Sequence, residues 1–225
     1  MKKKLLAFFL FAFNLTVAYG QAQQNLLLQD AGNHVMVQKY VDIKGSPFYN
    51  ADWQTGTLTL MTNKVYKDMS MKYDEVADKV YIKAANDGLI LLNDKVKEFV
   101  LDFSGPNGNE VKVFRLGYSN IPDASPDSYF EVLIDGKAQL LKKITKIIQE
   151  NREYNSASST KTFIDVVKYY IFIQGNGILI KRDKKSILKA LSDKQPALET
   201  YIKENNLNLK AELDIKKLLV YYNSL

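Results

Sequence analysis

The sequence contains no cysteine and only one histidine, His34. Without cysteine the chain has no disulfide, no thiol nucleophile and no cysteine that could be lipidated. Zinc sites built on histidine and cysteine are excluded by count, and a Ser-His-Asp triad would have to use His34. This residue precedes the strand-rich part of the chain, so we interpret it as a surface or strand-start histidine without a catalytic role.

Motifs for phosphate and metal binding are also lacking. The 11 glycines are scattered, and no Gly-Lys-Ser/Thr follows any of them, which excludes a glycine-rich phosphate loop. Two loops are rich in oxygen ligands: one holds Asp123, Asp127 and Glu131, the other Asn107, Asn109 and Glu110. Neither matches the twelve-residue calcium loop, and such residues serve turns more often than metals. We therefore predict no catalytic residue, no cofactor and no metal site.

Export is the clearest prediction that the residues present allow. Lys2 to Lys4 form a positive start, Leu5 to Val17 an apolar run, and Ala18-Tyr19-Gly20 a small-residue cleavage site. This order is typical of a secretory signal peptide, here residues 1–20. A membrane anchor is the alternative, but the run is shorter than the roughly 20 residues of a span. We expect a periplasmic or secreted protein with no transmembrane span after cleavage.

Charge gives little support for a nucleic-acid partner. The formal net charge is +6, and removal of the first 20 residues lowers it to +3. The remaining excess is weak and evenly spread, whereas nucleic-acid binding needs a basic patch. We predict that no nucleic acid binds.

The stretch from Thr57 to Phe103 predicts a meander of antiparallel strands. Large apolar residues alternate with polar ones, as in Met69, Met71 and Tyr73 and again in Phe99, Leu101 and Phe103. A period of two places one face on a core and the other in water. Turn-forming triplets separate the runs: Thr62-Asn63-Lys64, Asn86-Asp87-Gly88 and Asn93-Asp94-Lys95.

Further strands follow, with loops at residues 104–109 and 121–127 and a strand over 111–116. Asp135-Gly136 predicts the turn of a hairpin over residues 129–148, because Asp-Gly between apolar runs is a strong hairpin signal. The polar residues 149–161 predict a loop. Gly175-Asn176-Gly177 predicts the turn of a last hairpin.

The pattern becomes helical after residue 182. Asp183, Asp193 and Asn208 are each predicted to cap a short helix, with Pro196 in the first turn of the second. In the last helix Ile215, Leu218, Leu219 and Tyr222 share one face. Strands before helices predict an α+β fold, an antiparallel, curved β-meander sheet with short C-terminal helices packed on it. The predicted divisions are 1–20, a β-rich region 21–182, and a helical segment 183–225 on the same domain.

Several stretches together resemble a broad group of uncharacterised exported proteins of Bacteroidota. They are GTLTL with NKVYKDMSMKYD, FEVLIDGKAQLLK, and the tail from YYIFIQGNG to LLVYYN. The resemblance covers nearly all of the chain after residue 20. It implies the compartment and the architecture, and it brings no catalytic residue, ligand or cofactor.

Two features favour a structural interpretation over a binding one. The basic run Lys181-Arg182-Asp183-Lys184-Lys185 suits an anionic surface, but Asp183 in its middle suits a helix cap. Tyr169-Tyr170 and Tyr221-Tyr222 suit a glycan or ligand groove, but tyrosine is also common where a core meets water. We prefer the helix start and the core edge.

These observations favour a non-enzymatic binding or interaction module of the cell envelope. Its partner would be an envelope protein or an apolar or glycan ligand. Two alternatives stay open at this point. One is a periplasmic carrier of a lipid or acyl chain, which needs an apolar cavity. The other is a carboxylate-based hydrolase, which needs two facing carboxylates in a cleft.

Overall fold

The computed structural model describes residues 34–36, 40–84, 87–105, 108–152 and 159–225. Strands come first and helices last, which confirms the α+β class. The chain divides into two compact units, Met1–Val111 and Lys112–Leu225. Within the described ranges, no helix has the length and apolarity that crossing a membrane requires.

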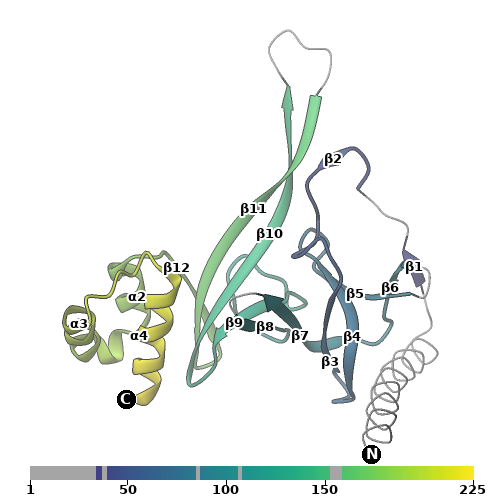
Figure 1. Ribbon diagram of the computed structural model, residues 1–225. Coiled ribbons are helices and arrows are strands. Elements are labelled where there is room, and N and C mark those ends of the chain that lie inside the picture. The colour runs from purple at the N-terminus through teal and green to yellow at the C-terminus, as the bar shows by residue number, and fades with distance from the viewer. Residues whose placement is uncertain (1–33, 37–39, 85–86, 106–107, 153–158) are drawn as a thin grey trace, which may run out of the picture. The chain divides into compact units, whose positions relative to one another are not determined.

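The first unit is built from short antiparallel strands (Figure 1). They are β1 (His34–Met36), β2 (Ile43–Lys44), β3 (Gln54–Leu60), β4 (Val65–Asp74), β5 (Lys79–Lys83), β6 (Leu89–Leu91) and β7 (Val96–Gly105). Their order is β1-β6-β5-β4-β3-β7. Strands β3 to β6 form the predicted meander, but β7 returns to pair with β3, so a simple meander is wrong there. Gly56 of β3 permits this pairing, because a side chain there would collide with the Val100 carbonyl.

Alternation in the first unit is confirmed by burial. Met69, Met71 and Tyr73 of β4 are at most 2% exposed, as are Phe99 and Leu101 of β7. The predicted turns are also present. Asn63 and Asp87 adopt positive φ values of 64° and 62°, a conformation that Asn and Asp tolerate better than most residues. Asn86 lies outside the described residues.

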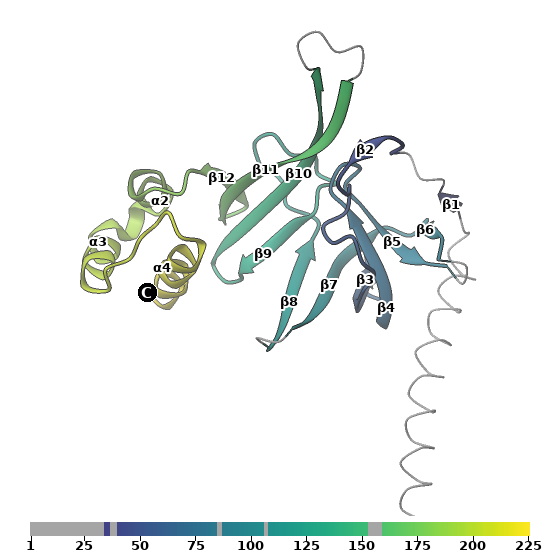
Figure 2. The ribbon, with the colours of Figure 1, turned by 45° about the horizontal axis from the view of Figure 1, so that its top comes forward.

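The second unit combines the remaining strands with all of the C-terminal helices (Figure 2). Its elements are β9 (Phe130–Ile134), β10 (Ala138–Arg152), β11 (Ser159–Ile173), β12 (Asn176–Ile180), α2 (Lys184–Ala190), the 3-10 turn Ser192–Lys194, α3 (Gln195–Glu204) and α4 (Glu212–Ser224). The division of the chain falls within β8 (Gly108–Arg115), whose last two residues pair with β9. From there the strand order is β9-β10-β11-β12.

Strands β10 and β11 form a hairpin of two 15-residue strands, longer than the sequence predicted. The loop predicted over residues 149–161 is wrong at both ends, because β10 continues to Arg152 and β11 begins at Ser159. The register is unbroken from Ala138↔Ile173 to Arg152↔Ser159. At the far end of the hairpin, both faces of the two strands are exposed to water, and the residues there are polar. A strand is usually predicted from the alternation of a buried and an exposed face, so these residues gave no strand signal.

The base of this hairpin is covered on both faces. On one face Leu140 and Ile171 share a core with all three helices of the unit. That core includes the predicted stripe of α4, whose members are 0–2% exposed: Ile215, Leu218, Leu219 and Tyr222. On the opposite face Leu141 and Tyr170 pack with Phe130. The stripe prediction is therefore confirmed.

Only one of the three predicted helix caps is confirmed. The Asp183 carboxylate accepts a 2.7 Å hydrogen bond from the Ser186 N–H and caps α2. Asp193 instead lies in the 3-10 turn and accepts from the Tyr222 hydroxyl at 3.0 Å. Asn208 binds the Lys210 N–H within the preceding loop, and α4 begins only at Glu212. The side chains of Asp193 and Asn208 accept these hydrogen bonds and do not cap a helix, so the two predicted caps are wrong.

Candidate functional site

The residues predicted as possible ligands do not converge. Asp123 lies on the surface with its carboxylate 3.1 Å from Lys168 Nζ, while Glu131 is 3% exposed within β9. Asp127 is exposed in a turn, where its N–H donates to the Ser125 hydroxyl. Across the residues that the structure describes, no group of three or more acidic, histidine or cysteine side chains could hold a metal ion.

The second predicted loop and the histidine can be placed only in part. Asn107 lies outside the described residues, and Glu110 is an exposed residue of β8. His34 is the first residue of β1, and its backbone lies opposite Leu91 of β6. The backbone of His34 is therefore that of a strand-start residue, as the sequence analysis predicted.

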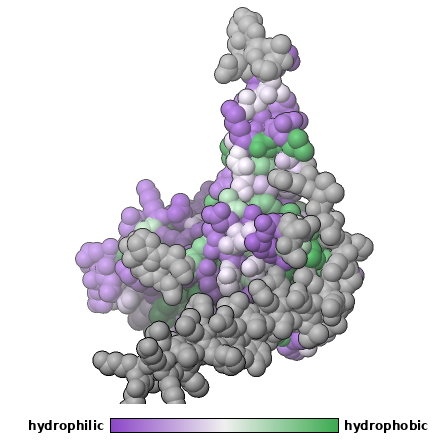
Figure 3. Space-filling view, turned by 45° about the vertical axis from the view of Figure 1, so that its right-hand side comes forward, coloured by the Kyte–Doolittle hydropathy of each residue, from purple (hydrophilic) through white to green (hydrophobic). Residues whose placement is uncertain are grey.

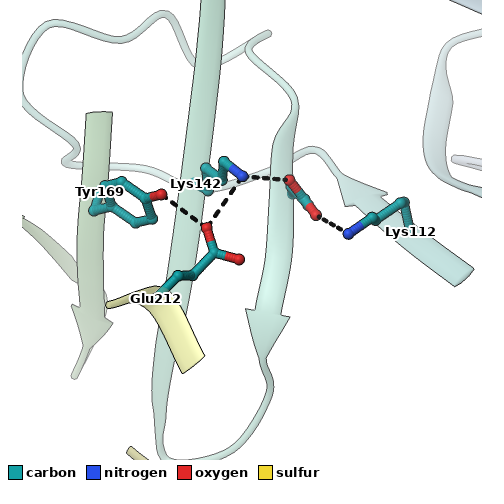
Figure 4. Close-up of polar contacts among 5 residues, drawn as sticks. Lys112, Lys142, Tyr169 and Glu212 are labelled. Carbon is teal, nitrogen blue, oxygen red and sulfur yellow. Dashed lines mark hydrogen bonds and ion pairs between the residues drawn. The ribbon is translucent and has the colours of Figure 1, made fainter. Parts of the chain in front are cut away.

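The structure instead gathers ionisable side chains around Glu131 (Figure 4). We call this set the Glu131 cluster: Glu131, Lys112, Lys142, Tyr169 and Glu212. The sheet register explains most of it, because Lys142 of β10 lies opposite Glu131 of β9 and opposite Tyr169 of β11. Directly opposite residues of antiparallel strands point to the same face. Glu212, the first residue of α4, completes the cluster and contacts both Tyr169 and Lys142.

Two lysines neutralise the two carboxylates of the cluster. Lys142 Nζ lies 3.1 Å from Glu212 Oε2 and 3.8 Å from Glu131 Oε2. Lys112 Nζ lies 3.4 Å from Glu131 Oε1. The Tyr169 hydroxyl donates a 2.7 Å hydrogen bond to Glu212 Oε2. Four strands and a helix are thus joined through five side chains.

The surroundings shift the pKa values of two side chains in the cluster, Tyr169 and Glu212. Burial, followed by the hydrogen bond to Glu212, raises the pKa of Tyr169 to about 12. Burial alone would raise the pKa of Glu212, but hydrogen bonds from Tyr169 and Lys142 outweigh it and the pKa is lowered. At neutral pH Tyr169 is therefore a neutral donor and Glu212 an ionised acceptor.

The lowered pKa of Glu212 makes this side chain a poor general acid. A general acid must carry a proton near the working pH, and an ionised Glu212 carries none. Glu131 Oε2 accepts no hydrogen bond from the described residues, so its charge depends on the two lysines. A carboxylate at the start of α4 also interacts favourably with the positive end of the helix.

Sequence reasoning missed Lys142 and Glu212. Lys142 interrupts the apolar alternation of Ala138, Leu140 and Ile144, and a charge on an otherwise core-facing row is a signal that could have found it. Glu212 has no comparable signal. Its side chain is only 28% exposed in the structure.

The paired tyrosines lie in the core of the second unit or pack against it. Tyr169 and Tyr170 lie on opposite faces of β11, each 7% exposed or less. Tyr222 is 2% exposed and donates to Asp193, whereas Tyr221 stacks on Tyr201 with ring centroids 4.0 Å apart.

A second feature that the sequence did not reveal is a side-chain lock on the β9–β10 turn. The Asn223 amide accepts from the Ala138 N–H and donates to the Ala138 carbonyl, both at 2.9 Å. Gly136 lies against the same amide, and any side chain at this position would collide with it. The Asp-Gly turn thus serves α4 as well as the hairpin.

The hairpin continues well beyond its base as β10 paired with β11. We call residues 143–152 and 159–168 the hairpin arm, which extends past β9 and β12 in Figures 1 and 2. Apolar residues lie opposite one another along it: Ile144 and Val167, Ile147 and Ile164, Ile148 and Phe163. Ile147, Ile148, Ile164 and Val167 are 38–49% exposed. Figure 3 shows hydrophobic surface along the arm bordered by hydrophilic side chains.

Comparisons of the chain with protein-family models, with curated proteins and with solved structures found no match in any of the three.

Proposed function

We propose that this chain is an exported, non-enzymatic interaction module of the cell envelope that contacts its partner through the hairpin arm. The proposal includes cleavage of a signal peptide at residues 1–20, a periplasmic or secreted location, and a curved sheet that presents the arm. It also includes membership of the Bacteroidota group that the sequence resembles. The signal-like start of the sequence supports the export step.

The observation that carries the proposal is the exposed apolar surface of the arm. Leaving aliphatic side chains in water forgoes about 25 cal/mol for each Å² of apolar area that could be buried. The arm exposes such residues on both faces, since Ile147 and Ile148 are neighbours and point in opposite directions. Contiguous exposed apolar surface rimmed by polar residues is typical of a protein-interaction site.

The Glu131 cluster supports the non-enzymatic part of the proposal. Its carboxylates are paired with lysines, and the lowered pKa of Glu212 makes it a poor proton donor. The hydrolase and carrier hypotheses stay predictions, because no feature of the described residues favours either of them over the module.

Site-specific photo-crosslinking in living cells tests the proposal. A photoreactive residue at Ile147 should yield a defined crosslinked species in the envelope. The same residue at Lys203, on the exposed face of α3, is the matched control and should yield none. Equal crosslinking from both positions, or none from any position of the arm, would contradict the proposal.

A further inference from the structure

We infer that the first unit carries a binding site for an acidic carbohydrate, a sugar chain that bears carboxylate groups. The site lies on one face of the adjacent strands β3, β4 and β5. We call it the Trp53 patch: Trp53, Thr55, Ser70, Lys72 and Lys83. The hairpin arm belongs to the second unit, so this inference goes beyond the proposed function and does not depend on it.

The sheet register brings the patch together. Ser70 and Lys72 are two residues apart in β4, so their side chains point to the same face of the sheet. Thr55 of β3 lies opposite Ser70 and shares this face. Trp53 directly precedes β3, and both lysines reach its indole: Lys72 Nζ lies 5.0 Å and Lys83 Nζ 5.9 Å from the ring centroid. Three adjacent strands therefore contribute to one surface.

Two positive charges meet at the indole of Trp53. An aromatic face attracts a cation, and Lys72 Nζ also lies 5.1 Å from the ring centroid of Phe48. The two ammonium groups nevertheless repel each other. Burial lowers the pKa of Lys72, and the charge of Lys83 lowers it further, whereas Asp52 opposes both effects. An anion beside both lysines would be attracted to each of them and would offset their repulsion.

Of the two lysines, Lys72 has the less complete charge neutralisation among the described residues. Lys83 Nζ forms an ion pair with Asp87 at 2.7 Å. Lys72 Nζ forms neither an ion pair nor a hydrogen bond with any residue that the structure describes, and Asp52 acts on it from beyond ion-pair distance. A ligand carboxylate at Lys72 would add a charge-assisted hydrogen bond, which is stronger than one between neutral groups.

The other members of the patch suit a carbohydrate. A sugar ring combines hydroxyl groups with an apolar face of C–H groups. The hydroxyls of Thr55 and Ser70 form no hydrogen bond with the described residues and are at least partly accessible, so they can bind sugar hydroxyls. Trp53 is half-buried, and its indole offers a broad apolar surface to the sugar ring. The flexible lysine side chains can move from the indole to the ligand carboxylate.

The fluorescence of Trp53 tests the inference directly, because this residue is the only tryptophan in the chain. Titration with oligogalacturonate, an oligomer of a carboxylated sugar, should change the Trp53 emission in a saturable way. The neutral oligomer of galactose should bind at least roughly tenfold more weakly, which corresponds to about 1.4 kcal/mol. Sodium acetate at the same carboxylate concentration should produce no saturable change, because acetate has no sugar ring.

Substitution of Lys72 provides the matched comparison. Lys72→Met keeps the apolar part of the side chain but removes the charge, so it should weaken oligogalacturonate binding at least roughly tenfold. Lys72→Arg keeps the charge and should bind with an affinity close to that of the wild type. Lys67→Met removes one charge from an exposed position of the same strand and should leave binding unchanged. If Lys72→Met does not fold, Lys83→Met provides the same test, because it removes the second charge.

Three results would overturn the inference. One is the absence of a saturable change in Trp53 emission with oligogalacturonate. Another is equal affinity for the neutral oligomer, which would remove the role of the lysines. The third is equal weakening by Lys67→Met and Lys72→Met, which would indicate attraction to the overall charge of the chain. None of these results bears on the hairpin arm, whose crosslinking is measured separately.

Discussion

Glu131 is a charged residue whose side chain is almost completely buried. It is 3% exposed, and Lys112 and Lys142 neutralise it at 3.4 and 3.8 Å. Glu131→Gln keeps the shape but leaves Lys112 without this counter-charge. We expect the free energy of unfolding to fall by about 1–3 kcal/mol, the range for losing an interaction with a charged, buried group. Urea titration measures this change.

A double-mutant cycle provides the control for this prediction. Lys112→Met removes the partner, so Glu131→Gln combined with Lys112→Met should cost less than the sum of the two single changes. Additive costs would show that Glu131 and Lys112 do not interact. A cost of Glu131→Gln within 0.5 kcal/mol of wild type would contradict the prediction itself, since that is the range of roughly neutral surface changes.

The raised pKa of Tyr169 leads to a prediction about stability at alkaline pH. Its pKa is raised to about 12 by burial and by the hydrogen bond to Glu212, while an unfolded tyrosine titrates near pH 10. The folded state therefore holds this proton more tightly, and the resulting stability is complete below about pH 10 and lost as the pH rises to about 12. Tyr169→Phe should make the free energy of unfolding fall less steeply over this range. An unchanged slope by denaturant titration would contradict it.

Sequence reasoning located only part of this site. Glu131 was considered as a loop ligand, because its sequence neighbours Asp123 and Asp127 are loop residues, and its burial in a strand was not foreseen. Lys142 and Tyr169 meet it through cross-strand register, and Glu212 arrives from a helix 81 residues after Glu131 in the sequence. Local periodicity contains no information about such long-range contacts. The same limit explains why Asp193 and Asn208 were wrongly predicted as caps.

At the scale of elements, α4 offers a matched pair of leucines. Leu218 is 0% exposed in the core shared with the sheet, whereas Leu213 of the same helix is 63% exposed. Leu218→Ala should lower the free energy of unfolding by about 2–5 kcal/mol, because it leaves a cavity. Leu213→Ala should change it by less than about 0.5 kcal/mol. Equal effects in urea titration would show that α4 is peripheral.

Elements with one buried face were predicted well, and elements with two exposed faces were not. The alternation of β4 and β7 and the stripe of α4 each follow from a periodic apolar face. The outer parts of β10 and β11 have no such face, and their polar residues were interpreted as a loop. The pairing of β7 with β3 also escaped prediction, because it depends on a close backbone approach at Gly56.

For the whole molecule, the sequence makes a testable prediction about processing. The positive start, apolar run and small residues up to Gly20 predict cleavage by a signal peptidase. Protein extracted from the envelope should begin near Gln21 or Gln23 by N-terminal mass spectrometry. Protein that retains Lys2 to Lys4 would contradict export by this route.

The lock between Asn223 and Ala138 has a consequence for the order of events during biogenesis. The turn between β9 and β10 emerges early, but the amide that satisfies the Ala138 backbone belongs to a residue 85 positions later. Closing so long a loop is slow compared with forming a hairpin. The hairpin base therefore waits for α4, with the apolar surface beneath the helix exposed meanwhile. This interval is when the newly made chain would most need a holding chaperone.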